Sequence, residues 1–137
     1  MKLLLLTKKF PYPLKDGESQ AIHGLSKSLS ELGCEVSLLA MNTTKHYFAG
    51  TELPEKMAHY HEVRTVTVDN EISPLDALGN LVRGTSYHIS RFDIPEYHAA
   101  LSQWLKEKTF EVVQLETLYL SPYVPTIRRH SSAQVVM

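Results

Sequence analysis

The chain has 137 residues, 43% of them hydrophobic and 21% charged, which fits one globular domain and excludes a disordered, collagen-like or coiled-coil chain. Its 14 basic and 15 acidic residues give a formal charge of -1, so composition offers no electrostatic reason to bind nucleic acid. The single cysteine, Cys34, cannot staple the fold or hold a metal cluster, which fits a reducing cytosol.

The amino terminus opens on a short apolar run at residues 3–6. This run is too short for the core of a signal peptide, and it stops at Lys8 and Lys9. No segment approaches the roughly 18 to 20 apolar residues that are needed to span a bilayer. We therefore expect a cytoplasmic protein, and the two lysines leave open a peripheral contact with the inner face of a membrane.

The first forty residues predict a strand, a helix and a second strand. Residues 2–7 are continuously apolar, as in a strand that is covered on both faces. A helix is expected from about Glu18, and Gly33 stands where a helix C-cap glycine belongs. The side chains predicted to form its apolar face are Ile22, Leu25, Leu29 and Leu32. Residues 35–41 then predict the second strand, which completes a βαβ unit.

The later elements continue the alternation of strands and helices. The alternating residues 61–68 predict a third strand at an edge of the sheet. The expected elements after it are a short helix at 75–84, a loop at 85–93, a helix at 94–108 with Tyr97, Leu101, Trp104 and Leu105 inside, a strand at 110–116, a helix at 119–129 and a strand at 134–137. This order predicts an α/β fold with an open, mostly parallel, Rossmann-like sheet of about five strands, ordered 3-2-1-4-5, with helices on both faces. We interpret the very short last strand as the sign of a truncated domain.

The loop after the first strand is the strongest candidate site, because ligands of open parallel sheets bind at the carboxyl ends of the strands. The glycine-rich signatures of dinucleotide-binding and nucleotide triphosphatase folds are absent from the whole chain, so we predict no such cofactor. The loop instead carries two prolines and then Asp16, Gly17 and Glu18. Asp16 can cap the helix, or the backbone N–H groups there can hold a phosphate or a sugar hydroxyl.

Three segments resemble one enzyme family. Residues 2–17 resemble the opening of the retaining glycosyltransferases of family four (group 1), which have the GT-B fold. Residues 25–39 resemble the helix-Gly-His-x-Val-strand segment of that family, with Cys34 where histidine is usual. Residues 110–123 are similar to the fourth strand and following helix of a bacterial branch. Together the segments cover about half of the chain, in the family's order and spacing.

The resemblance implies that residues 1–137 are the acceptor-side, N-terminal half of a GT-B enzyme. The second domain, with the nucleotide-sugar site and the paired catalytic glutamates, would then be absent, and this half alone would be inactive. The whole enzyme would be a mannosyltransferase-like hexosyltransferase that acts on a glycan or lipid-linked acceptor in bacterial surface polysaccharide synthesis. A non-catalytic flavodoxin-like regulatory module or a carbohydrate-binding module is the alternative.

The resemblance also assigns roles to named residues. Asp16, Gly17 and Glu18 would form a donor-phosphate or acceptor loop, although Glu18 stands where the family usually has a second glycine. Glu116 stands near a position where many members have histidine. Two roles stay open for Glu116, namely binding acceptor hydroxyls and capping the backbone turn that follows.

Further candidates come from polar side chains elsewhere. Tyr87 and Arg91, in the loop before the long helix, suit an acceptor site with an anionic lipid phosphate, or they belong to an ordinary surface loop. His23, on the first helix, is an acceptor-binding candidate or a solvated side chain. His59 and His61 share a face of the expected strand, but no carboxylate or cysteine is spaced to complete a metal site. We therefore predict no metal.

Overall fold

The computed structural model describes residues 1–43, 55–68 and 92–137. Its strands are β1 (Lys2–Thr7), β2 (Glu35–Thr43), β3 (Glu62–Val68), β4 (Val112–Leu115) and β5 (Gln134–Val136). Its helices are α1 (Gly17–Glu31), α4 (Pro95–Glu107) and α5 (Val124–His130), with 3-10 turns η1 (Glu55–Met57) and η2 (Leu118–Tyr123).

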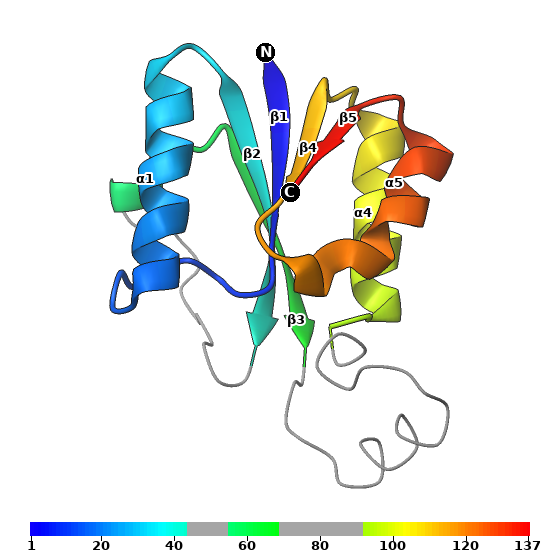
Figure 1. The fold of residues 1–137 in the computed structure, drawn as a ribbon, viewed down its shortest axis with the longest axis horizontal. Helices are drawn as coiled ribbons and strands as arrows, with labels where there is room; N and C mark the ends of the chain where they lie inside the picture. Colours follow the sequence, from blue (N-terminus) through cyan, green and yellow to red (C-terminus); the bar gives the residue numbers. More distant parts are fainter. Residues whose placement is uncertain (44–54, 69–91) are drawn as a thin grey trace, which may run out of the picture.

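The five strands form one open, all-parallel sheet in the order β3-β2-β1-β4-β5. Helix α1 covers one face of the sheet, and α4 and α5 cover the other (Figure 1). The predicted Rossmann-like α/β fold and its strand order are therefore confirmed. Strand β1 lies in the middle, between β2 and β4, so the loop that follows it leaves the centre of the sheet.

The apolar run of β1 supplies both cores. Leu4 and Leu6 pack in the core beneath α4 and α5, whereas Leu3 and Leu5 pack in the core beneath α1. Alternate side chains of a strand point to opposite faces, so a strand covered on both sides must be apolar throughout. The run therefore indicates a central strand and not a membrane segment, and no helix within the described ranges is long and apolar enough to cross a bilayer.

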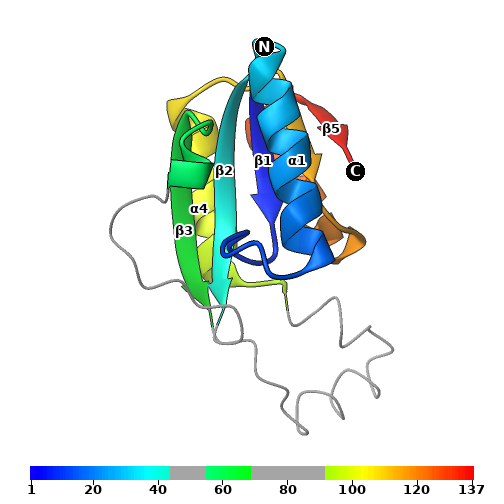
Figure 2. The same cartoon turned by 90° about the vertical axis from the view of Figure 1, so that its left-hand side faces the viewer.

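Helix α1 lies across β1 and β2 (Figure 2), with its two ends formed as predicted. Asp16 precedes the helix, and its Oδ1 accepts a hydrogen bond of 2.7 Å from the backbone N–H of Ser19. Gly33 follows the helix with a φ of 95°, a left-handed conformation that costs glycine little.

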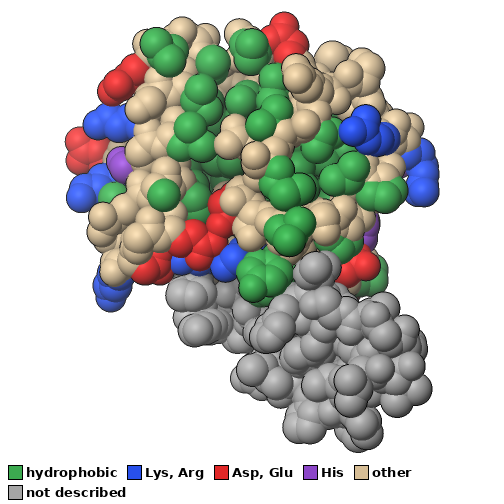
Figure 3. Space-filling view, viewed as in Figure 1, with side chains coloured by type: hydrophobic (Ala, Val, Ile, Leu, Met, Phe, Trp, Pro, Cys, Tyr) green, Lys and Arg blue, Asp and Glu red, His purple; other side chains and the backbone are tan. Residues whose placement is uncertain are grey.

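The predicted apolar face of α1 is partly wrong. Leu25 is 42% exposed and Leu32 is 82% exposed, and the buried residues of the helix are Ser19, Ile22 and Ser26. The face is rotated because the hydroxyl of Ser26 meets side chains from the segment that precedes β3, as described below. Figure 3 shows apolar side chains gathered on the surface between α1 and α5, along the edge of the sheet that β5 forms.

The long helix agrees with the prediction. Pro95 opens α4, and the four predicted inward side chains, Tyr97, Leu101, Trp104 and Leu105, are all buried. The hydroxyl of Tyr97 donates a 2.7 Å hydrogen bond to the backbone carbonyl of Leu39 on β2. This bond ties the helix to the sheet inside the core.

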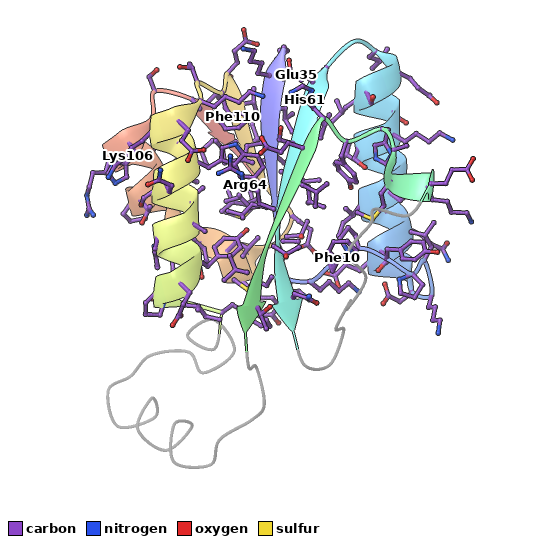
Figure 4. All side chains as sticks on the ribbon, turned by 180° about the vertical axis from the view of Figure 1, so that it is seen from behind. Phe10, Glu35, His61, Arg64, Lys106 and Phe110 are labelled. Atoms are coloured by element: carbon purple, nitrogen blue, oxygen red, sulfur yellow. The ribbon has the colours of Figure 1, made fainter. Side chains whose placement is uncertain are left out.

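Strand β3 forms one edge of the sheet, as predicted, and Arg64 lies on it. The guanidinium of Arg64 lies 4.3 Å from the ring centroid of Trp104 and makes ion pairs with Glu62 at 3.1 Å and Glu107 at 2.8 Å. Figure 4 shows Arg64 between the outer strand and α4. The arginine thus covers the buried indole and links the edge strand to the helix.

Two predicted segments have a different outcome. The predicted helix at 75–84 lies outside the described residues. The predicted helix at 119–129 is divided into the 3-10 turn η2 and the short helix α5. Pro122 and Pro125 explain the division, because proline has no N–H to donate to the preceding turn.

Candidate functional site

A group of charged side chains gathers where β1 and β4 end. Leu6 pairs with Leu115 in the parallel register, so Lys8 and Glu116 leave the two strands side by side. The backbone N–H of Glu116 donates to the carbonyl of Leu6 at 3.0 Å, and the N–H of Lys8 lies 3.4 Å from Glu116 Oε2. The start of α1 brings two more carboxylates to this place. We call Lys8, Lys9, Asp16, Glu18 and Glu116 the carboxyl-edge cluster.

Lys9 connects the loop to the first turn of α1. Its side chain is 4% exposed, and its Nζ lies 2.7 Å from Asp16 Oδ2 and 3.1 Å from Glu18 Oε2. The hydroxyl of Thr7 donates to the Lys9 carbonyl at 2.7 Å, which fixes the turn after β1. Burial, the largest influence, lowers the pKa of Lys9, but the hydrogen bonds to Asp16 and Glu18 outweigh it and the pKa is raised.

The carboxyl groups of Glu18 and Glu116 are neighbours through Lys8, whose Nζ lies 3.1 Å from Glu18 Oε1 and whose backbone N–H lies 3.4 Å from Glu116 Oε2, and each carboxyl group shifts the pKa of the other. Burial is the main cause that raises the pKa of Glu116 to about 8, and the neighbouring Glu18 raises it further. For Glu18, burial also opposes ionisation, but the hydrogen bonds from Glu116, Lys8 and Lys9 lower its pKa. The two pKa directions therefore leave one proton on the pair at neutral pH and favour Glu116 over Glu18 as its holder.

One of the two roles predicted for Glu116 is not observed. The turn η2 is capped by Thr117, whose side-chain oxygen accepts from the N–H of Tyr119. The carboxyl group of Glu116 instead turns toward Lys8 and Glu18. Capping of the following turn is therefore done by Thr117.

Two aromatic rings flank the same cluster. The Lys8 Nζ lies 5.8 Å from the ring centroid of Phe92 and 5.8 Å from that of Tyr119, within the range of cation–π attraction. The two ring centroids are 5.6 Å apart. Tyr119 is 36% exposed, so its ring reaches the solvent beside the charged groups.

The cluster suits hydroxyl groups better than phosphate. It offers one protonated carboxyl as donor, one carboxylate as acceptor and an exposed aromatic ring. Asp16 already occupies the N–H of Ser19, which reduces the anion-binding capacity of the helix start. Acidic and basic side chains lie next to each other at this end of the sheet in Figure 3. Donor-phosphate binding by the loop stays a prediction.

Gly17 is the first residue of α1, and it needs no special conformation. A Cβ added there would meet no atom within 4 Å. Unlike Gly33, Gly17 does not have a positive φ. The glycine therefore leaves space at the helix start, but the backbone does not require it.

The other predicted site residues lie elsewhere. The ring of His23 meets that of His59 edge to face, with centroids 5.2 Å apart. His59 and His61 both precede β3, so their placement on one strand face was wrong. His61 instead pairs with Glu35 at 2.9 Å. Tyr87 and Arg91 lie outside the described residues.

No group of three or more potential metal ligands occurs among residues 1–43, 55–68 and 92–137.

The sequence did not predict that Lys8 and Lys9 form ion pairs inside the candidate site. They were considered only as partners of an anionic acceptor or a membrane surface. Their position directly after the central strand was the available signal, because it places them at the carboxyl edge together with Glu116.

No protein-family model matches the chain, and no curated protein matches it either. One similar solved structure is the C-terminal domain of a hydrogenase from Pyrococcus furiosus, with a TM-score of 0.51 and 13% sequence identity. The match covers 99% of this chain and 91% of that domain. At this identity the likeness indicates a shared fold alone.

Proposed function

We propose that the chain is the acceptor-side domain of a glycosyltransferase that moves a hexosyl group from a nucleotide sugar to a glycan or lipid-linked acceptor. The proposal rests on the resemblance of three segments to retaining GT-B enzymes, and one observation carries it to a site. That observation is the pair of Glu18 and Glu116, which Lys8 brings together at the carboxyl ends of the central strands.

The pair has the chemistry that recognition of a sugar hydroxyl requires. A hydroxyl group both donates and accepts, so a sugar hydroxyl that enters between the two groups accepts the proton of Glu116 and donates its own hydrogen to the carboxylate of Glu18. Lys8 and Lys9 favour the ionised form of Glu18, since their Nζ atoms lie 3.1 Å from its carboxylate oxygens. Glu116 and Glu18 are therefore assigned to acceptor binding, and no catalytic step is assigned to them.

Tyr119 extends this site. Its partly exposed ring lies beside Lys8, at the same end of the sheet as the carboxyl pair. The apolar C–H face of a pyranose can pack on such a ring while its hydroxyls reach the polar groups. An acceptor sugar would thus contact the ring and the carboxyl pair together.

The nucleotide sugar would be bound mainly by a second domain, which would also supply the family's paired glutamates. A diphosphate brought to the carboxyl-edge cluster would meet the carboxylates of Asp16 and Glu18. We therefore expect nucleotide diphosphates to leave the backbone amide NMR signals of Gly17 and Glu116 unshifted.

Saturation-transfer NMR with methyl glycosides and short oligosaccharides tests the proposal. We expect at least one hexoside to bind at pH 7 and binding to weaken above pH 9, because Glu116 then loses the proton that it donates. Glu116→Leu should weaken binding by about tenfold, the equivalent of one lost hydrogen bond to a charged or polar partner.

Glu111→Leu is the matched control, because Glu111 lies exposed just before the opposite end of β4. It should bind hexosides like the unaltered chain. Equal binding by the Glu116 and Glu111 variants would contradict the assigned site. Strong shifts at Gly17 and Glu116 on addition of a nucleotide diphosphate would contradict the assignment of the donor to another domain.

A further inference from the structure

A pocket lies beside α1 and shares no residue with the carboxyl-edge cluster. It has a volume of about 380 Å³ and opens between α1, η1 and the loop after β1. The residues that line it are Leu14, His23, Lys27, Glu55, Lys56 and His59. Its volume is in the lower part of the range for small-molecule sites.

The wall of this pocket is held in place by buried hydrogen bonds. His59 Nε2 lies 2.7 Å from the hydroxyl oxygen of Ser26, which also lies 2.9 Å from the hydroxyl of Tyr60. Ser26 is fully buried, and Met57 and Tyr60 anchor η1 and the residues after it in the core beneath α1. The pocket is therefore a formed feature of the fold, and it explains the serine on the inner face of α1.

His59 forms part of the wall and is not free to bind an anion. Burial is the main cause that lowers its pKa, and the nearby charges of His23 and Lys27 lower it further. With its Nε2 engaged by Ser26, His59 contributes the rest of its ring to the lining of the pocket. The ring of His23, held edge to face against it at 5.2 Å, is the second imidazole of the lining.

The charged lining is predominantly basic. Lys27 and Lys56 are exposed. Among the described residues, the lysines that form ion pairs are Lys8, Lys9 and Lys108, so Lys27 and Lys56 are not among them. Glu55 is the acidic residue among the six lining residues. Two ammonium groups and an imidazole N–H around one concave site match the oxygen atoms of a phosphoryl group.

We propose that this pocket binds a small phosphorylated ligand of the size of a hexose phosphate. Lys27, Lys56 and His23 bind the phosphoryl group, and Leu14 and the ring of His59 contact the carbon skeleton. The carboxylate of Glu55 accepts hydrogen bonds from the hydroxyl groups of the ligand. The site is independent of acceptor binding at the carboxyl edge, so either proposal can fail without the other.

The imidazole signals of His23 and His59 report on binding directly. We would titrate the chain at constant pH and ionic strength with inorganic phosphate and with glucose 6-phosphate, and follow the histidine ring C–H signals by NMR. Both ligands should shift the two histidines in a saturable manner. Glucose 6-phosphate should bind more tightly than phosphate, because the sugar adds contacts with Leu14, His59 and Glu55.

Charge-matched variants separate a site from general attraction. The double variant Lys27→Gln with Lys56→Gln should weaken binding of both ligands by about tenfold or more. The double variant Lys15→Gln with Lys106→Gln loses the same charge outside the pocket and should bind like the unaltered chain. Lys106 projects outward from α4 in Figure 4. Glu55→Gln should strengthen binding of inorganic phosphate, because it removes the nearest negative charge of the lining.

The proposal is overturned if the histidine signals do not saturate, or if both double variants weaken binding equally, which would indicate only a general attraction of anions. Equal affinity for the two ligands would overturn the assignment of a hexose phosphate.

Discussion

The two ends of the central strands differ in how well their carboxyl groups are balanced by basic side chains. At the amino end, Glu35 lies between Lys108 at 2.8 Å and His61 at 2.9 Å, and its side chain is one-third exposed. Figure 4 shows Glu35 and His61 together at this end. The hydrogen bond from Lys108 is the main cause that lowers the pKa of Glu35. The Glu35 carboxylate thus has a basic side chain as a partner on each side.

At the carboxyl end, three carboxyl groups meet two lysines. Asp16 and Glu18 take up the cations, and Glu116 keeps a proton because its surroundings cannot support another negative charge. Crowded carboxyls are not required for folding, as the amino end demonstrates with the same residue types. The comparison indicates that a candidate polar site can be recognised by carboxyl groups that outnumber the basic side chains around them.

The largest effect is expected from removing the buried cation of the carboxyl end. Lys9→Met should lower the free energy of unfolding by about 2 to 3 kcal/mol, because Asp16 and Glu18 lose a buried partner while solvent screens part of the loss. Lys108→Met removes a more exposed lysine from the amino end and should have a smaller effect. Urea denaturation at pH 7 measures both, and an equal loss in the two variants would remove the contrast between the ends.

The second effect concerns pH. Folded Glu116 has a pKa raised from 4.5 to about 8, so between these values the folded chain binds more protons than the unfolded chain. Stability contributed by this group is therefore lost as the pH rises from about 5 to 9. Glu116→Gln mimics the protonated form and should be more stable than the unaltered chain at pH 9 by about 1 to 2 kcal/mol, with no gain at pH 5.

Glu111→Gln is the control for this pH dependence, because its carboxyl group lies exposed at the amino end. Denaturation curves at pH 5, 7 and 9 for the three chains give the measurement. If the stability of Glu116→Gln changed with pH in the same way as that of the unaltered chain, the raised pKa of Glu116 would be contradicted.

The smallest effect tests the core below the carboxyl end. Tyr97→Phe removes the hydroxyl that donates to Leu39 and leaves that buried carbonyl without its side-chain donor, which should cost about 1 kcal/mol. Tyr119→Phe, at the exposed ring of the same end, should leave stability unchanged. Thermal unfolding of both variants checks this, and a larger loss for Tyr119→Phe would show that the Tyr119 hydroxyl has a structural role.

Much of the fold could be predicted because its signals are local. The apolar run of β1, the inward side chains of α4 and the glycine after α1 each depend on a few neighbouring residues. The inner face of α1 could not be predicted in the same way. Ser26 is buried there because His59 and Tyr60, more than thirty residues away in sequence, supply its hydrogen-bond partners.

The candidate site was only partly predictable for a similar reason. Glu18 was a candidate from its place at the helix start, and Glu116 was one from the family resemblance near the end of the fourth strand; the parallel topology brings the two together. Their shared proton depends on burial and on the path of the loop that carries Lys8 and Lys9. Neither is visible in residue spacing, so the sequence did not predict that the two glutamates would share a site and shift each other's pKa.

The arginine on β3 has a consequence for the protein in concentrated solution. An unpaired strand edge is a template on which a strand from another chain can add and start aggregation. Arg64 places a charged group on this edge and holds it with Glu62, Glu107 and the face of Trp104. A strand that added to this edge would come to lie beside a fixed cation and two carboxylates, which disfavours pairing with an apolar strand of another chain.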